Sequence, residues 1–203
     1  DTINIRPFNL SKQIARGIDF EVSYRANLDT IVSDWNGSLM LRFLATNFLR
    51  NWQSNGITIP IEGAGANSAG VPGYLPNWRW NSSATYSNES FSVNIGARGV
   101  SAGVYNNSNV QCTSGCPVST ANNRTVDNNH IDGAVYWDTS FTYKFHAGDA
   151  ATEAFLNIRN IANKAPAVVA PGPGGYTYEA APYNGALYDA LGRTFRAGIR
   201  FRM

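Results

Sequence analysis

Few side chains in this sequence could take part in catalysis or hold a metal. Cys112 and Cys116 are separated by three residues. They could form a small disulfide loop or half of a metal site. Cys-x-x-Cys is the more usual metal spacing and a second pair is missing, so the disulfide is favoured. His130 lies near Asp127 and Asp132, which suggests either a metal site or, the favoured interpretation, a solvated junction between a loop and a strand.

The sequence contains no recognisable catalytic arrangement. No spacing of Ser, His and Asp builds a triad, and no nucleophile elbow is present. The Gly-rich run from 63 to 70 neither follows a strand nor opens a helix, so we expect a flexible loop rather than a phosphate cradle. The sequence therefore predicts a protein that is not an enzyme and that has no cofactor and no metal site.

The composition indicates the class of protein that must position these residues. Charged residues make up 15% of the 203 residues and aromatic residues 12%, whereas a soluble domain carries about 25% charged residues. Asn, Ser, Thr and Gly fill the deficit, which is typical of all-β chains and of outer-membrane barrels. The net charge of +2 and the scattered basic residues argue against nucleic-acid binding. No stretch approaches the roughly 20 apolar residues of a transmembrane helix.

Alternation of apolar and polar residues is the main structural signal, and it predicts strands with one apolar face. The clearest example runs from Trp137 to Phe145, where Trp137, Phe141, Tyr143 and Phe145 share one face. The pattern predicts seven strands, at about 14–27, 37–50, 76–87, 90–104, 131–146, 152–161 and 193–203.

The predicted connections alternate between short turns and long loops. Three long loops, at about 51–75, 105–130 and 163–192, are expected to be structureless. Such loops are unusual in a compact soluble domain, but outer-membrane barrels combine short periplasmic turns with longer extracellular loops. The sequence thus predicts an antiparallel transmembrane barrel with the long loops outside.

Aromatic placement separates the barrel from its soluble alternative, a β-sandwich or jelly roll. One band of aromatic residues lies beside the long loops and consists of Trp78, Trp80 and Trp137. A second band lies beside the short turns and consists of Tyr86, Phe91, Tyr143 and Phe145. Two such belts match the two membrane interfaces and favour the barrel. Since an open, odd-numbered sheet would leave bare edges in lipid, we expect further strands to come from a longer chain or a partner, with this chain a fragment or a processed product.

Three segments resemble TonB-dependent receptors, which are outer-membrane transporters. They are Arg16–Glu21, Leu156–Pro166 and Tyr188–Phe195, the last leading into the final strand. The resemblance implies the C-terminal seven or so strands of a 22-stranded barrel, with residues 1–203 all in the barrel and the plug domain absent. Phe201 is the nearest match to the terminal aromatic residue that serves such barrels as an assembly signal, displaced by two positions.

The resemblance also implies a function and a set of partners. The implied function is TonB-coupled active uptake of siderophore-bound iron, cobalamin or an oligosaccharide across the outer membrane of a Gram-negative bacterium. The implied partners are the remaining barrel strands, the plug, TonB through a missing N-terminal region, lipid and lipopolysaccharide, and the small nutrient itself. The alternatives are a structural or anchoring barrel piece in a surface assembly and a soluble carbohydrate-binding sandwich.

Candidate substrate-binding residues fall into two groups. Loop aromatics could stack on a sugar or siderophore ring, or could pack loop against loop: Trp52, Tyr74, Tyr105, Tyr176, Tyr178 and Tyr183. Polar residues of the inward face could bind substrate, or could pair with one another and with a plug: Asp19, Glu21, Arg25, Arg42, Arg79, Arg98, Asp138, Lys144, Arg159, Arg196 and Arg200. Among these, Asp138 and Arg79 are the preferred candidates.

Overall fold

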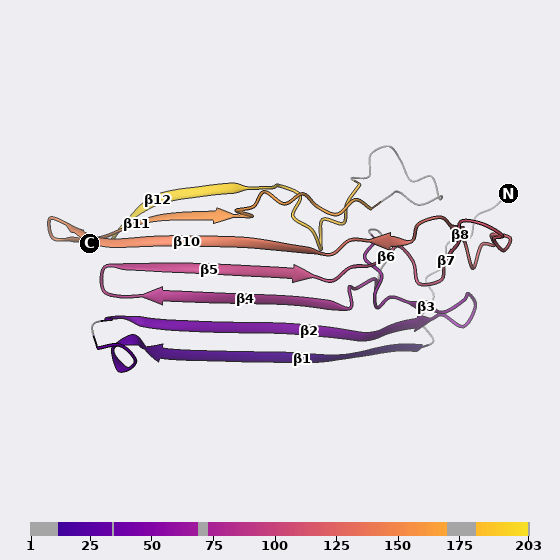
Figure 1. The fold of residues 1–203 in the computed structure, drawn as a ribbon, viewed down its shortest axis with the longest axis horizontal. Helices are drawn as coiled ribbons and strands as arrows, with labels where there is room; N and C mark the ends of the chain where they lie inside the picture. Colours follow the sequence, from indigo (N-terminus) through magenta and orange to yellow (C-terminus); the bar gives the residue numbers. More distant parts are fainter. Residues whose placement is uncertain (1–11, 34, 69–72, 170–181, 203) are drawn as a thin grey trace.

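Seven long antiparallel strands form one sheet in the computed structural model, which describes residues 12–33, 35–68, 73–169 and 182–202 (Figure 1). The strands are β1 (Lys12–Asn27), β2 (Ser38–Ser54), β4 (Trp78–Ser87), β5 (Phe91–Val100), β10 (Ala134–Ala147), β11 (Ala150–Arg159) and β12 (Thr194–Arg202). Their order across the sheet follows their order along the chain. The all-β, antiparallel class is confirmed, and the strand ends differ from the expected ones by only a few residues.

The described sheet is open. Its edges are β1 and β12, each of which pairs with a single long strand in the described part of the chain. The short β3 (Ile61–Glu62) pairs with the end of β2. A 3₁₀ turn, η1 (Leu28–Thr30), connects β1 to β2. Within the described residues, no helix has the length and apolar character needed to cross a membrane.

The two faces of the sheet differ in chemistry. Because side chains alternate along a strand and paired residues share a face, the strand registers place nearly all the large apolar side chains together. This apolar face includes Ile18, Phe20, Val22, Leu41, Phe43, Trp80, Ala84, Val93, Ile95, Trp137, Phe141, Leu156, Ile158, Phe195 and Ile199. The polar face carries the row of charged residues expected from the sequence, from Asp19 on β1 to Arg200 on β12.

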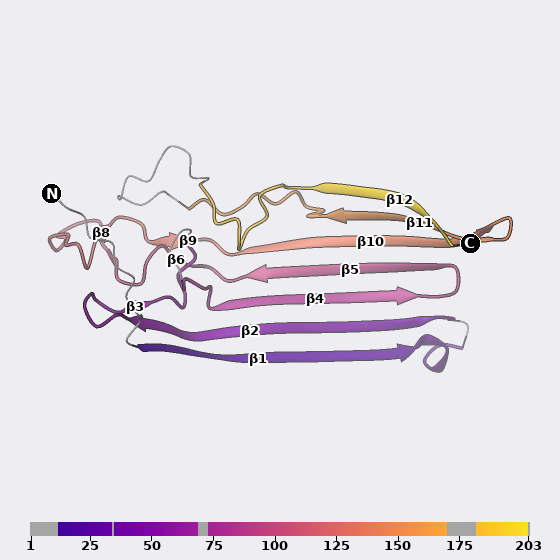
Figure 2. The same cartoon turned by 180° about the vertical axis from the view of Figure 1, so that it is seen from behind.

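Short and long connections lie at opposite ends of the sheet (Figure 2). At the turn end, residues 88–90 join β4 to β5, and the Asn88 side-chain oxygen accepts hydrogen bonds from the Ser90 and Phe91 amides. Gly148, with φ of +63°, and Asp149 form the two-residue turn between β10 and β11. At the loop end lie the described parts of the connections between β2 and β4, between β5 and β10, and between β11 and β12, namely 55–68, 73–77, 101–133, 160–169 and 182–193.

The connection between β5 and β10, residues 101–133, is not structureless, which corrects the expectation from sequence. It contains β6 (Gly103–Val104), β7 (Val110–Gln111), β8 (Thr125–Val126) and β9 (His130–Ile131), with β6 paired to β9 and β7 to β8. The predicted strands 90–104 and 131–146 are each interrupted. The reason lies in close backbone crossings, since a Cβ on Gly133 would lie 2.6 Å from the Ala102 nitrogen.

Candidate functional site

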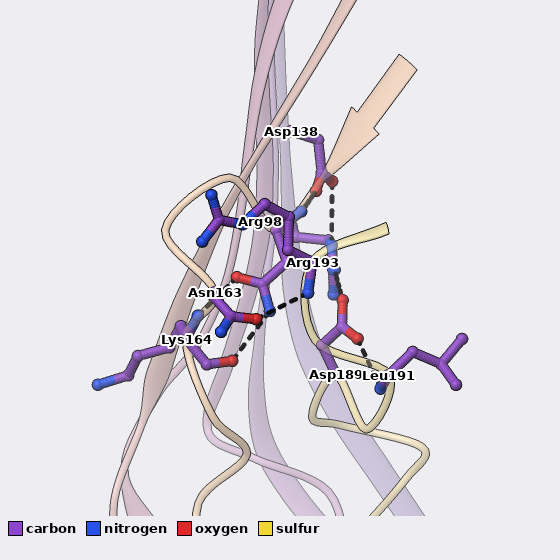
Figure 3. Close-up of polar contacts among 8 residues, drawn as sticks. Arg98, Asp138, Asn163, Lys164, Asp189, Leu191 and Arg193 are labelled. Carbon is purple, nitrogen blue, oxygen red and sulfur yellow. Dashed lines mark hydrogen bonds and ion pairs between the residues drawn. The ribbon is translucent and has the colours of Figure 1, made fainter. Parts of the chain in front are cut away.

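An ion-pair cluster ties the connection before β12 to the polar face of the sheet (Figure 3). Arg98 on β5 holds two carboxylates. Its Nε lies 3.2 Å from Oδ2 of Asp138 on β10, and its Nη2 donates to Oδ2 of Asp189. The guanidinium also lies over the ring of Tyr136, 4.6 Å from the ring centroid. The planar fork of an arginine suits such a shared arrangement.

Backbone amides orient both carboxylates. Asp138 Oδ1 accepts a hydrogen bond of 2.8 Å from the Asn160 amide, and Asp189 Oδ1 accepts one of 3.1 Å from the Leu191 amide. Asn160 occupies a left-handed conformation with φ of +50° and exchanges two hydrogen bonds with the Lys164 backbone. Backbone hydrogen bonds near Asp138 and Asp189 thus fix the orientation of both carboxylates toward Arg98.

A buried tyrosine joins all three long connections. Tyr188 donates from its hydroxyl to the Asp132 carbonyl at 2.8 Å and accepts from Asn67 Nδ2 at 3.1 Å. The same Asn67 nitrogen donates to the Ser101 carbonyl, and Asn184 donates to the Asn67 carbonyl. Burial raises the pKa of the Tyr188 phenol above its usual value, so the hydroxyl remains a donor at neutral pH.

A small apolar core lies under this junction. Its buried members are Val100, Ile131, Ala134, Tyr136, Val169 and Tyr188. Three buried polar atoms beside it have no hydrogen-bond partner in the described part of the chain, namely Asn67 Oδ1, Ser68 Oγ and the Tyr136 hydroxyl. Buried polar atoms are seldom left unpaired, so the junction has hydrogen-bonding capacity for a water molecule or a ligand. The described part of the run 63–70 is packed into this junction, contrary to the expected flexible loop.

Two hollows open among the loops, and each contains one of the predicted aromatic residues. The first, of about 510 Å³, is lined by residues that include Ile59, Tyr74 and Asn122. Its lining carboxylate, Glu62, accepts hydrogen bonds from the Asn51 and Ala64 amides. Burial, and to a smaller extent Tyr105, raise the pKa of Tyr74, so this hollow combines a neutral phenol with the Glu62 carboxylate.

The second hollow, of about 580 Å³, is more charged. Tyr105, Asp127, His130, Asp132 and Lys164 contribute to its lining. His130 Nε2 lies 3.0 Å from Asp132 Oδ1, which places one predicted pair together. Within the described residues, no group of three or more His, Cys, Asp or Glu side chains could hold a metal ion.

The structure distributes the other predicted site residues widely. Arg79 lies on the polar face opposite Thr46 and Val100, and it forms no ion pair with any described residue. Trp52 lies near the end of β2, with the Arg50 guanidinium 5.6 Å from its ring. Tyr176 and Tyr178 lie outside the described residues.

The remaining predicted features lie far from the Arg98 cluster. Cys112 and Cys116 are joined by a disulfide, with Cα atoms 5.6 Å apart, in the connection between β5 and β10. Phe201 lies on the apolar face of β12, paired with Thr152 of β11 near the turn end. Neither feature contributes to the junction of the loops.

Sequence reasoning missed the residues that organise the loop end. In the sequence, Tyr188 and Asp189 stand out only as part of the segment Tyr188–Phe195, and Asn67 only as part of the Gly-rich run 63–70. Their partners are 91 and 121 residues away along the chain, so no local pattern could have revealed the contacts. The only available signal was the position of Arg98 in the charged row.

Comparison of the chain with protein-family models, with curated proteins and with solved structures found no match.

Proposed function

We propose that this sheet is part of the barrel wall of an outer-membrane transporter of the TonB-dependent type, which takes up a scarce nutrient. The observation that supports the proposal best is the exposure of the apolar face. Ile95 is 50% exposed and Phe141 43% exposed, although they lie in the middle of β5 and β10, two interior strands of the sheet. Apolar surface on this scale calls for an apolar partner, and lipid is the partner that a β-barrel wall meets.

The aromatic bands support the same proposal. Trp78 and Phe20 stack with ring centroids 6.0 Å apart at the loop end, and Tyr86 and Phe91 approach to 5.4 Å at the turn end. Tyr86 lies eight positions after Trp78, which is about 26 Å along a strand. At the strand tilt of roughly 40° usual in barrels, this is about 20 Å, close to the height of the apolar band of such proteins.

The transport part of the proposal rests on the polar face and the loop end. A lumen-facing row of charges and loop hollows of several hundred cubic ångströms suit the capture and passage of a polar solute. The candidate nutrients are siderophore-bound iron, cobalamin and an oligosaccharide. The other barrel strands, a plug, TonB, lipid and lipopolysaccharide are the partners that this function requires.

Depth-dependent fluorescence tests the membrane part. The full-length protein would be purified with Trp137 as its only tryptophan, or with Trp52 alone as the matched control, and placed in bilayers of brominated lipid. We expect strong quenching of Trp137, which lies on the apolar face, and weak quenching of Trp52, which lies beyond the band. Equal quenching, or a protein that is monodisperse in plain buffer, would instead support a soluble sandwich.

Uptake in cells tests the transport part. We expect cells that depend on this protein to lose uptake of its nutrient when TonB is deleted. The protein could instead reside in the outer membrane without affecting uptake. If neither its deletion nor the deletion of TonB changes uptake of any of the three nutrient classes, the protein is a structural or anchoring barrel piece.

A further inference from the structure

We propose that Arg98 is the binding residue for a small carboxylate-bearing solute, and that Asp189 occupies this site while no solute is bound. Residues 182–193, which we call the strap, carry Asp189 across the polar face. A solute carboxylate would replace the Asp189 carboxylate on Arg98 and so release the strap at this point. The inference extends the proposed function, on which it rests for the arrival of the solute from the loop end.

The strap reaches a long way to make this contact. Asp189 precedes β12, whereas Arg98 belongs to β5, and β10 and β11 lie between these two strands in the sheet. The Asp189 side chain is only 9% exposed, so its charge is withdrawn from water. A buried ion pair gains little net stability because desolvation offsets the attraction. An incoming carboxylate with the same geometry can therefore replace Asp189 at small net cost.

The other half of the site does not depend on the strap. Asp138 still holds Arg98 Nε, and the Asn160 amide holds Asp138. The ring of Tyr136 supports the guanidinium from below. When Asp189 leaves, Arg98 Nη2 remains directed to the same place, and a preformed receptor of this kind lowers the cost of binding.

Room for the body of the solute lies directly beside Arg98. A hollow of about 250 Å³ on the polar face is lined by residues that include Arg42, Asn81, Gly96, Arg98 and Asp138. Arg42 contributes a second guanidinium to the lining, which Glu21 holds at 2.8 Å. A site with two arginines and this volume suits a compact di- or tricarboxylate.

The test follows the strap while citrate is added to the full-length protein in detergent. Since Cys112 and Cys116 are joined in a disulfide, Leu191→Cys adds a free thiol for a spin label, and any free cysteine elsewhere in the full-length protein is first replaced by Ser. Leu191 is 81% exposed and lies two residues from Asp189. We expect citrate, but not an equal ionic strength of chloride, to increase the mobility of the label. Citrate affinity is measured in parallel by calorimetry.

Two substitutions decide the outcome. Asp189→Asn keeps the side-chain oxygen that accepts from the Leu191 amide but removes the charge. We expect it to free the label without citrate and to tighten citrate binding about tenfold. Arg98→Gln is expected to abolish the response to citrate. If Arg98→Gln fails to fold, Asp189→Asn still tests the proposal alone.

Matched controls separate a built site from diffuse attraction. Asp29→Asn changes a carboxylate of the turn between β1 and β2, and Arg124→Gln changes an exposed arginine between β7 and β8. Both should leave the label and the citrate affinity unchanged. An unchanged Asp189→Asn variant, or an Arg124→Gln variant that loses the response as fully as Arg98→Gln, would overturn the proposal. The label and the calorimetry require no transport. The carboxylate site can therefore be disproved while the proposed transport function stands, and the transport function can be disproved while the carboxylate site stands.

Discussion

The sheet and the loop end of this molecule are stabilised in different ways. In the sheet, the strands are joined by continuous backbone ladders, and large apolar side chains on one face remain exposed. At the loop end, short strands are joined by buried side chains such as Asn67 and Tyr188. The sheet is regular and depends on its surroundings to cover one face. The loop end is irregular and supplies its own small core.

The contrast shows where specificity and stability reside. Backbone ladders tolerate many side chains as long as the alternation is kept, because every residue of a strand makes the same kind of hydrogen bond. A buried polar junction tolerates few changes, because each lost partner leaves a desolvated group unpaired. We therefore expect substitutions in the sheet to report the medium around it, and substitutions at the loop end to report individual contacts.

The largest expected effect comes from a charge on the apolar face. Ile95 lies in the middle of β5 and is 50% exposed. If lipid covers this face, Ile95→Arg should lower the free energy of unfolding in bilayers by about 2–4 kcal/mol. Asn94→Arg, on the opposite face, should cost no more than about 1 kcal/mol through the hydrogen bond to Thr85. Denaturant titration measures both, and similar costs would argue against lipid on one face.

The next effect tests packing within the sheet. The indole of Trp80 lies over Gly99 of the neighbouring strand, and a Cβ at Gly99 would be 2.2 Å from the ring. Gly99→Ala should therefore cost about 1–3 kcal/mol, the usual penalty for overpacking. Gly96→Ala is the matched control, since its Cβ would have no neighbour closer than 3.7 Å. A destabilisation by Gly96→Ala equal to that by Gly99→Ala would show that backbone freedom, not Trp80, is responsible.

A smaller and more local effect is expected at the junction of the loops. Tyr188→Phe removes the hydrogen bonds to Asp132 and Asn67 while keeping the ring. We expect the loop end to lose about 1–2 kcal/mol of local stability, seen as faster amide hydrogen exchange in residues 101–133 and 182–193. Exchange in β4 and β5 should not change. A uniform increase across the sheet would show that the two regions unfold together.

The smallest effect is a pH dependence with a defined sign. Burial raises the folded-state pKa of Tyr188 above the unfolded value of about 10. The stabilisation from this phenol is thus complete below about pH 10 and is lost as the pH rises through the folded pKa. The free energy of unfolding, measured by denaturant titration at several pH values, should fall in that alkaline range by more in the unmodified protein than in Tyr188→Phe. An identical fall in both proteins would assign the effect to other groups.

Much of the sheet was predictable because its signals are local. Alternation from Trp137 to Phe145 predicts a strand and its two faces without knowledge of any partner, since the pleat repeats every two residues. The turn at Gly148 and Asp149 is predictable for the same reason. The breaks after Val100 and before Ala134 were missed, because they result from close crossings between segments that are distant in sequence.

The sequence predicted several residues of the candidate site but not all of the contacts among them. Arg98 and Asp138 were expected on the polar face, and Tyr74 and Tyr105 among the loops. Pairing among the charges of the polar face was one of the two alternatives, and Arg98 does pair with Asp138. The second partner of Arg98, Asp189, was not expected.

The amino-acid sequence by itself therefore determined the strands, their order and the chemistry of the two faces, because hydrophobic alternation and turn residues act over a few positions. Only the tertiary structure decided how the long connections fold. Contacts such as that between Asn67 and Tyr188 are 121 residues apart. They form because buried polar groups must find partners wherever the sheet brings the loops together.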